Sequence, residues 1–280
     1  MKKAVPLLEV TVVVGLFFFL RTVLGDSAIA DWQQSIFGAA PVSSSLLYFV
    51  LPLVFVLAMR RNLGASGLAT QRLGYHLRVA IRAIAVVAPV TILFPLVVLL
   101  GSDPKQWLGA SILTIGFAAG GLVMARSVSG LANESETTIN VNGFLGYIGL
   151  LVAGLALVAL LNSVSQLLAR IVLALVFVAF LEEVFFRGYI QSRLNESFGK
   201  PYSFHGVSFG AGLLIAAAIF GLMHPLAAPD ETTPWAWAVW TATGGLIFGF
   251  LREKTGAVVT PAIVHGVILL PGVLFGAVGK

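Results

Sequence analysis

The stretch FLEEVFFRGYI, residues 180–190, places two adjacent carboxylates and one cation among strongly apolar side chains. Glu183 and Arg187 are four residues apart, so on a helix they share a face and can form a charge-assisted pair. Glu182 points about 100° away from Glu183 around that helix and has no such local partner. A carboxylate that faces a cavity can act as a general base and activate water. The spacing predicts that Glu183 and Arg187 brace the helix while Glu182 performs chemistry. The alternative is one buried ion-pair network of all three.

Two histidines follow in later apolar segments. His224 ends the run FGLMH, in which Phe220 lies one helical turn earlier, and His265 lies within VVTPAIVHGVI. Imidazole and carboxylate can serve as zinc ligands or as bases. Glu182, His224 and His265 are therefore candidate metal ligands and candidate catalytic residues. For either histidine alone, a structural hydrogen bond between helices is the alternative interpretation.

Composition defines the surroundings of these groups. The chain has 280 residues, of which 58% are hydrophobic and only 10% charged, whereas a soluble domain usually carries about 25% charged residues. Long unbroken apolar runs are unlike a β-barrel, whose strands alternate over about ten residues. The net charge of +5 comes from cations scattered among apolar segments. We therefore expect membrane lipid as a partner and no nucleic acid.

Apolar segments of about 17–25 residues predict helices that cross a membrane. They indicate an all-α fold, a polytopic transmembrane helical bundle of eight or nine helices, with a single membrane domain over residues 1–280. An ionised side chain at membrane depth costs at least about 2.5–3.5 kcal/mol, so it usually faces a protein interior or a cavity. The expected spans are 5–24, 44–59, 78–101, 108–126, 144–162, 167–190, 207–224, 235–251 and 257–277.

Positive residues predict the orientation, because cytoplasmic connections carry an excess of Lys and Arg. Lys2 and Lys3 precede the first span, which we expect to be an uncleaved helix with a cytoplasmic N-terminus. The densest basic cluster lies in residues 60–82 and is also expected inside. Segments 25–43 and 225–234 carry acidic residues without Lys or Arg, so they are expected outside. We expect the polar cavity to open toward the cytoplasmic side.

These motifs resemble a known family. EEVFFR matches the pattern EExxxR, FGLMH matches FxxxH, and a third histidine-bearing segment follows. In this order, over residues 165–275, they resemble the CPBP family of intramembrane metalloproteases, which includes type II CAAX prenyl endopeptidases and bacteriocin-processing or Abi relatives. The resemblance implies an integral protein of a bacterial or archaeal plasma membrane. It also implies an endopeptidase that hydrolyses a membrane-associated or lipidated protein or peptide, prenylated in the CAAX type.

The resemblance further implies roles for the site residues. Glu182 and His224 are expected to activate the attacking water, and His265 to bind a metal or help hold the oxyanion. A divalent metal, zinc, is the implied cofactor, with Glu182, His224 and His265 as its ligands. The expected supporting residues are Glu183, Arg187 and Phe220.

One position departs from the family pattern. Members often carry Asn or Asp four residues after the last histidine, and this chain carries Leu269. Leucine can neither bind a metal nor donate to an oxyanion, and an oxyanion donor can contribute about 3 kcal/mol. Leu269 therefore leaves open a catalytically inactive family member that acts as a scaffold or immunity protein. The buried Glu and His groups leave open a second alternative, a proton-coupled transporter that uses them as a relay.

Overall fold

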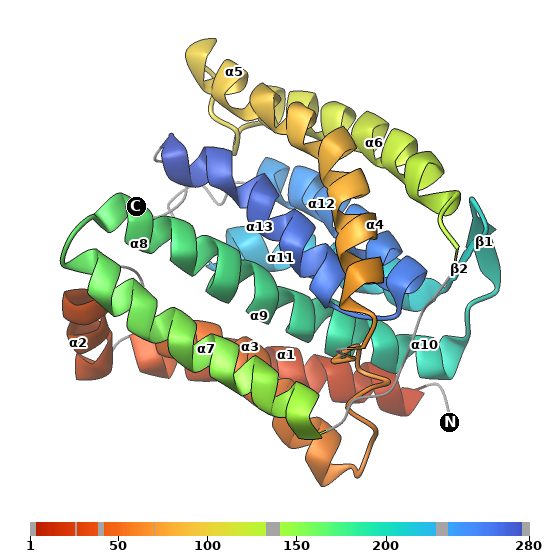
Figure 1. Cartoon of the computed structure of the whole chain (residues 1–280), viewed down its shortest axis with the longest axis horizontal. Helices are drawn as coiled ribbons and strands as arrows, with labels where there is room; N and C mark the ends of the chain where they lie inside the picture. Colours follow the sequence, from red (N-terminus) through yellow and green to blue (C-terminus); the bar gives the residue numbers. More distant parts are fainter. Residues whose placement is uncertain are drawn as a thin grey trace.

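A computed structural model describes residues 4–25, 27–38, 42–69, 71–132, 141–227 and 235–275. These residues are almost entirely helical, with one short antiparallel hairpin (Figure 1). The elements in chain order are α1 (Ala4–Gly25), α2 (Ala28–Phe37), α3 (Val42–Ala58), α4 (Leu73–Val87), η1 (Ala88–Ile92), α5 (Leu93–Leu99), α6 (Trp107–Ser129), α7 (Val141–Asn162), α8 (Gln166–Val172), η2 (Leu173–Val178), α9 (Ala179–Glu183), η3 (Val184–Gln191), α10 (Ser192–Phe198), β1 (Tyr202–Phe204), β2 (Val207–Phe209), α11 (Ala211–Ala227), α12 (Trp235–Thr255) and α13 (Val259–Leu274).

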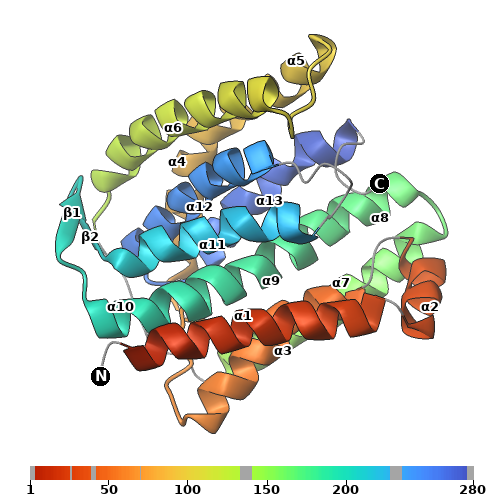
Figure 2. The ribbon, with the colours of Figure 1, turned by 180° about the vertical axis from the view of Figure 1, so that it is seen from behind.

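The helices form layers around the segment that contains α9. Helices α1, α3 and α7 lie on one side of this segment, and α11 and α13 lie on the other (Figures 1 and 2). Helices α4 and α6 then cover α12 and α13. The central position of α9 shields its polar side chains from lipid, which is where ionisable groups are tolerated in a membrane bundle.

Successive helices run between two ends of the bundle, and long-range hydrogen bonds identify the connections that meet at each end. At one end, Arg252 donates to the carbonyl of Ala65, and Lys254 donates to the carbonyl of Leu131. We call this the basic end; it includes the connection 59–72 and the β1–β2 hairpin, at the right of Figure 1. At the opposite end, Asn162 donates to the carbonyl of Ile36. The first two contacts bring the basic connection 59–72 and the end of α12 that carries Arg252 and Lys254 to the same end of the bundle.

A buried ionic network anchors the first helix at the basic end. Arg61 contacts both carboxylate oxygens of Glu9, and Arg193 donates to Glu9 Oε2 at 3.0 Å. The hydroxyl of Tyr189 also donates to Glu9 Oε1, at 2.6 Å. Glu9 is thus an intramembrane acid whose partners come from two other parts of the chain. Its contacts account for a charge that interrupts an otherwise apolar segment.

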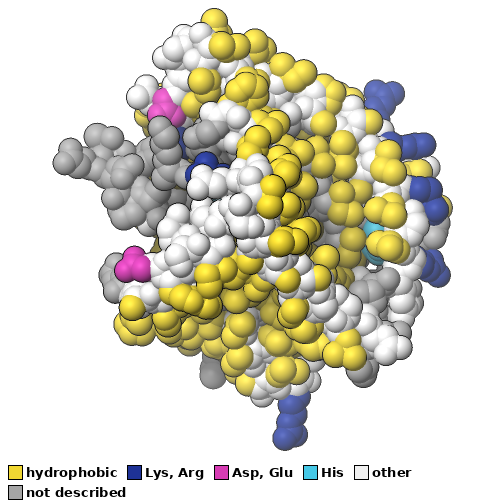
Figure 3. Space-filling model, turned by 60° about the vertical axis from the view of Figure 1, so that its left-hand side comes forward, with side chains coloured by type: hydrophobic (Ala, Val, Ile, Leu, Met, Phe, Trp, Pro, Cys, Tyr) yellow, Lys and Arg dark blue, Asp and Glu magenta, His cyan; other side chains and the backbone are white. Residues whose placement is uncertain are grey.

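The protein is an integral membrane protein. Within the described residues, four helices are long and apolar enough to cross a membrane by themselves: Ala4–Gly25, Leu73–Leu99, Trp107–Ser129 and Asn142–Asn162. Large apolar side chains lie exposed on these outer helices, for example Ile81 and Ile115. Figure 3 shows one such face, largely covered by hydrophobic side chains, with Lys and Arg gathered along one edge. Such a surface is suited to lipid contact.

Every expected apolar segment is helical over most of its length, and the all-α fold class is confirmed. Two features were not predicted. Helix α2 lies within the expected outer connection 25–43. Strand β2 replaces the expected start of the span 207–224, and β1 lies just before that span. A hairpin forms there because His205 and Gly206 adopt positive φ angles of 47° and 75°, which reverse the chain. Lys2, Lys3 and most of the expected outer segment 225–234 lie outside the described residues.

Candidate active site

The helix that carries the two glutamates is not a regular α-helix. The short helix α9, which ends at Glu183, lies between two π-helical stretches, η2 and η3. The wider turns of a π-helix are rare and frequently occur at functional sites. Nothing in the periodicity of the apolar residues indicates this irregularity, so the structure adds it to the sequence interpretation.

The predicted pairing of Glu183 with Arg187 is confirmed. Arg187 Nη1 donates to Glu183 Oε1 at 2.9 Å, and both side chains are completely buried. Arg187 Nη2 also donates to the carbonyl of Gly245 in α12, at 3.2 Å. The guanidinium lies 4.3 Å from the centroid of the Phe220 ring, a cation–π contact. Phe220 therefore supports the arginine of the first motif, and the pair fastens this helix to α11 and α12.

His265 contacts the same carboxylate from α13. Its Nδ1 lies 3.0 Å from Glu183 Oε1, and its Nε2 lies 3.9 Å from Glu182 Oε2. The ring is stacked on Phe248, with centroids 4.5 Å apart and an interplanar angle of 22°. The ring is consequently fixed by a hydrogen bond on one edge and by an aromatic face. Its second nitrogen is directed toward Glu182.

His224 is oriented by its own helix. Its Nδ1 lies 2.7 Å from the carbonyl oxygen of Phe220. Because a carbonyl oxygen only accepts, Nδ1 carries the proton in this contact, and the neutral ring then has its lone pair at Nε2. Trp237 packs against the ring edge at a centroid distance of 5.3 Å. This arrangement leaves Nε2 of His224 available as a base or a ligand.

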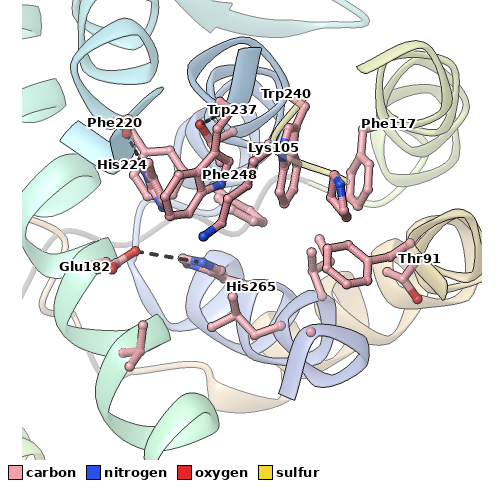
Figure 4. Close-up of a pocket in the computed structure, with 18 of the residues that line it drawn as sticks. Thr91, Lys105, Phe117, Glu182, Phe220, His224, Trp237, Trp240, Phe248 and His265 are labelled. Atoms are coloured by element: carbon pink, nitrogen blue, oxygen red, sulfur yellow. Dashed lines mark hydrogen bonds and ion pairs between the residues drawn. The ribbon is translucent and has the colours of Figure 1, made fainter. Parts of the chain in front are cut away.

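The three candidate catalytic residues meet in one cavity of about 260 Å³. Glu182 comes from α9, His224 from α11 and His265 from α13, and Figure 4 shows Glu182 and His265 facing each other with His224 beside them. Glu183 and Arg187 are not among the residues that line the cavity. The predicted division between a bracing Glu183 and a cavity-facing Glu182 thus agrees with the geometry. The alternative, one buried ion-pair network of Glu182, Glu183 and Arg187, does not agree with it, because Glu182 faces the cavity.

The cavity lies toward the end opposite the basic end. Its lining includes Asp103 and Lys105 from the connection between α5 and α6, and Trp237 from the first turn of α12. Glu182 lies roughly 20 Å along its helix from Phe198 at the basic end. Glu182 is equally far from Gln166 at the other end of the same helical segment, so it lies near the middle of the bundle. The side of the membrane toward which the cavity opens stays a prediction.

The donor set fits the expected metal only in part. The Nδ1 contacts leave Nε2 of both His224 and His265 free, which is how histidine ligands are usually held. However, no group of three His, Cys, Asp or Glu side chains within the described ranges is arranged to hold a metal ion. The residues as placed do not form the predicted zinc site.

Two further lining residues bear on the chemistry. Leu269 lines the cavity, so the departure from the family pattern affects the site itself. Lys105 lines it from outside the motif region and was missed by the sequence interpretation. A signal was available, because Lys105 is the only lysine between Lys3 and Lys200. It also lies in a connection where the positive-inside rule disfavours a cation.

Comparison with known proteins gives one match. Residues 164–271 match the family model described as type II CAAX prenyl endopeptidase Rce1-like. Neither the curated proteins nor the solved structures include a match to this chain. The matched segment contains all three motifs and the three candidate catalytic residues, Glu182, His224 and His265. The resemblance seen in the motifs is thereby confirmed: residues 164–271 of this chain are similar to the Rce1-like family of type II CAAX prenyl endopeptidases.

Proposed function

We propose that this protein is an intramembrane endopeptidase that cleaves a membrane-associated or lipidated peptide chain. One observation carries the proposal: Glu182, His224 and His265, from three different helices, line one cavity within a segment that matches a protease family. That family's description names prenyl substrates, so a prenylated peptide is the first substrate to test.

In the proposed reaction, Glu182 is the general base. The 3.9 Å separation of Glu182 Oε2 from His265 Nε2 is too long for a direct hydrogen bond and suits a bridging water. Glu182 would take a proton from this water while the water oxygen attacks the peptide carbonyl carbon. The proton then passes to the leaving nitrogen as the C–N bond breaks, with His224 assisting the transfer through Nε2. The products are one new carboxylate and one new amine.

The buried contacts of Glu183 would keep this geometry constant. Glu183 binds both Arg187 and His265, so it holds the helix of Glu182 at a set distance from α13. A displacement of about 1 Å at a catalytic group can cost about a hundredfold in rate. Glu183 is accordingly assigned a positioning role.

The test is hydrolysis by the purified full-length chain in proteoliposomes. A farnesylated reporter peptide is incubated with the wild type and with Glu182→Gln, and mass spectrometry identifies the fragments. Cleavage by the wild type alone supports the proposal. Equal cleavage by both proteins would rule out Glu182 as the base.

A second function is favoured by one observation. Leu269 occupies a cavity position where the family often has a polar side chain, as an inactive scaffold or immunity protein would permit. That alternative predicts no cleavage of any prenylated reporter. It also predicts that Glu182→Gln retains the full biological effect of the wild type.

A further inference from the structure

Lys105 brings a cation into the cavity. It lies in the connection between α5 and α6, at the end opposite the basic end, and its side chain is partly buried. Its Nζ lies 4.7 Å from the centroid of the Trp237 ring. Figure 4 shows the Lys105 side chain directed into the cavity that contains Glu182, His224 and His265.

This ammonium group has no anionic partner within the described parts of the chain. Asp103 accepts a hydrogen bond from the backbone N–H of Lys105 at 2.8 Å, which shapes the turn and does not neutralise the side chain. Glu182 is not paired with it either. A cation among apolar walls is costly unless an anion or water compensates it. A ligand that brings its own negative charge would supply the missing partner.

The rest of the lining selects the kind of anion. Phe94, Phe117, Ile268 and Leu269 give the cavity aromatic and aliphatic walls. A peptide tail with apolar side chains fits such walls, and the only charge it carries is its C-terminal carboxylate. A phosphate of a lipid headgroup would carry a large polar group into the same apolar space.

We propose that Lys105 binds the C-terminal carboxylate of an apolar substrate tail and so fixes the distance between the chain end and the cleaved bond. This inference rests on the proposed peptidase function. Lys105 would be a specificity-determining residue, because a substrate without a free C-terminus would lose a charge-assisted hydrogen bond.

The experiment pairs a change in the enzyme with a change in the substrate. Two reporters carry a farnesylated cysteine followed by Val, Ile and Leu, one with a free carboxylate and one with a terminal amide. They are cleaved by the wild type, Lys105→Met, Lys105→Arg and Arg126→Met. Arg126 is an exposed cation near the other end of α6, so its variant controls for the loss of one positive charge.

We expect the KM of the wild type to be about tenfold lower for the carboxylate reporter than for the amide reporter. In Lys105→Met the ratio of the amide KM to the carboxylate KM should fall to about one. Lys105→Arg should show an intermediate ratio, and Arg126→Met should show the wild-type ratio. A Lys105→Met enzyme that keeps the ratio overturns the proposal. An equal fall of kcat for both reporters also overturns it and assigns Lys105 to the oxyanion.

Two further arms separate the alternatives. Vesicles of phosphatidylcholine are compared with vesicles that contain phosphatidylglycerol. If the effect of Lys105→Met depends on lipid charge but not on the reporter's end group, Lys105 is assigned to lipid phosphate and the proposal is overturned.

Binding is also measured without catalysis, by tryptophan fluorescence of Glu182→Gln titrated with acetyl-Val-Ile-Leu as acid or amide. If Glu182→Gln binds the acid more tightly than the amide, and the double variant with Lys105→Met shows no such preference, the carboxylate site is supported even if no reporter is cleaved. Cleavage without any preference for the acid refutes this site while the peptidase function stands.

Discussion

The Nδ1 atom of His265 lies 3.0 Å from the Oε1 atom of Glu183, in a buried contact between residues 82 positions apart. The same oxygen accepts a hydrogen bond from Arg187 at 2.9 Å. One carboxylate oxygen thus joins the first motif to the third. Because it fixes the ring of His265, the other ring nitrogen is directed toward Glu182.

The first prediction concerns the base. Glu182→Gln keeps the size of the side chain but removes its ability to take a proton, so cleavage of the farnesylated reporter should fall by about 10²–10⁴. The rate is measured in proteoliposomes by quantifying the released fragment. Glu196→Gln is the matched control, since Glu196 is half-exposed in α10 and pairs with Arg193 outside the cavity. The assignment fails if the two variants have the same rate.

The second prediction concerns stability. Glu183→Gln or Arg187→Met alone should destabilise the protein by about 3–5 kcal/mol, because each leaves a buried charge without its partner. The double variant should be less destabilised than the sum of the two single variants. The free energies of unfolding are measured in detergent, with circular dichroism as the signal. Strict additivity would show that the pair has no coupling and would contradict this account.

The third prediction concerns Leu269, which lines the cavity one helical turn after His265. Leu269→Asn introduces a donor on the same helix face, and kcat should rise by about tenfold or more if the donor reaches the oxyanion. Leu270→Asn places the same side chain at the next position, which does not line the cavity, and should give no increase. Single-turnover kinetics with saturating enzyme separates this effect from binding. A fall in kcat for Leu269→Asn would count against an oxyanion near this position.

The fourth prediction concerns metal. The family resemblance implies a divalent metal, zinc, and its binding would require Glu182, His224 and His265 to approach more closely than in the described structure. Metal content of the purified protein is measured by plasma mass spectrometry, with His224→Ala and His265→Ala as the site variants. Loss of zinc in both variants but not in His76→Ala, which changes a buried histidine bonded to Thr260, would support the site. An active preparation without bound metal would refute it.

The fifth prediction concerns the side of the membrane. The chain has no cysteine, so single substitutions report accessibility without background labelling. Ser203→Cys lies in the exposed hairpin at the basic end, and Ser163→Cys in the exposed turn at the end near the cavity. In intact cells a membrane-impermeant maleimide should label Ser163→Cys, and Ser203→Cys only after lysis, because the basic end is expected in the cytoplasm. The opposite pattern would reverse the orientation.

The local features of this protein could be predicted from its sequence. Apolar runs long enough to cross a membrane predict helices whatever their neighbours are, because in lipid the backbone must satisfy its own hydrogen bonds. The pairing of Glu183 with Arg187 is also local, since it needs only the four-residue spacing of one helix. The motif order likewise identified the family later matched over residues 164–271.

The tertiary structure alone decided which distant groups meet. The contact of His265 with Glu183, the entry of Lys105 into the cavity and the position of the cavity away from the basic end depend on how helices pack. The periodicity of a segment shows which of its faces is apolar, but not which other segment covers that face. For this reason the sequence by itself determined the chemical groups and their helices, and packing determined their partners.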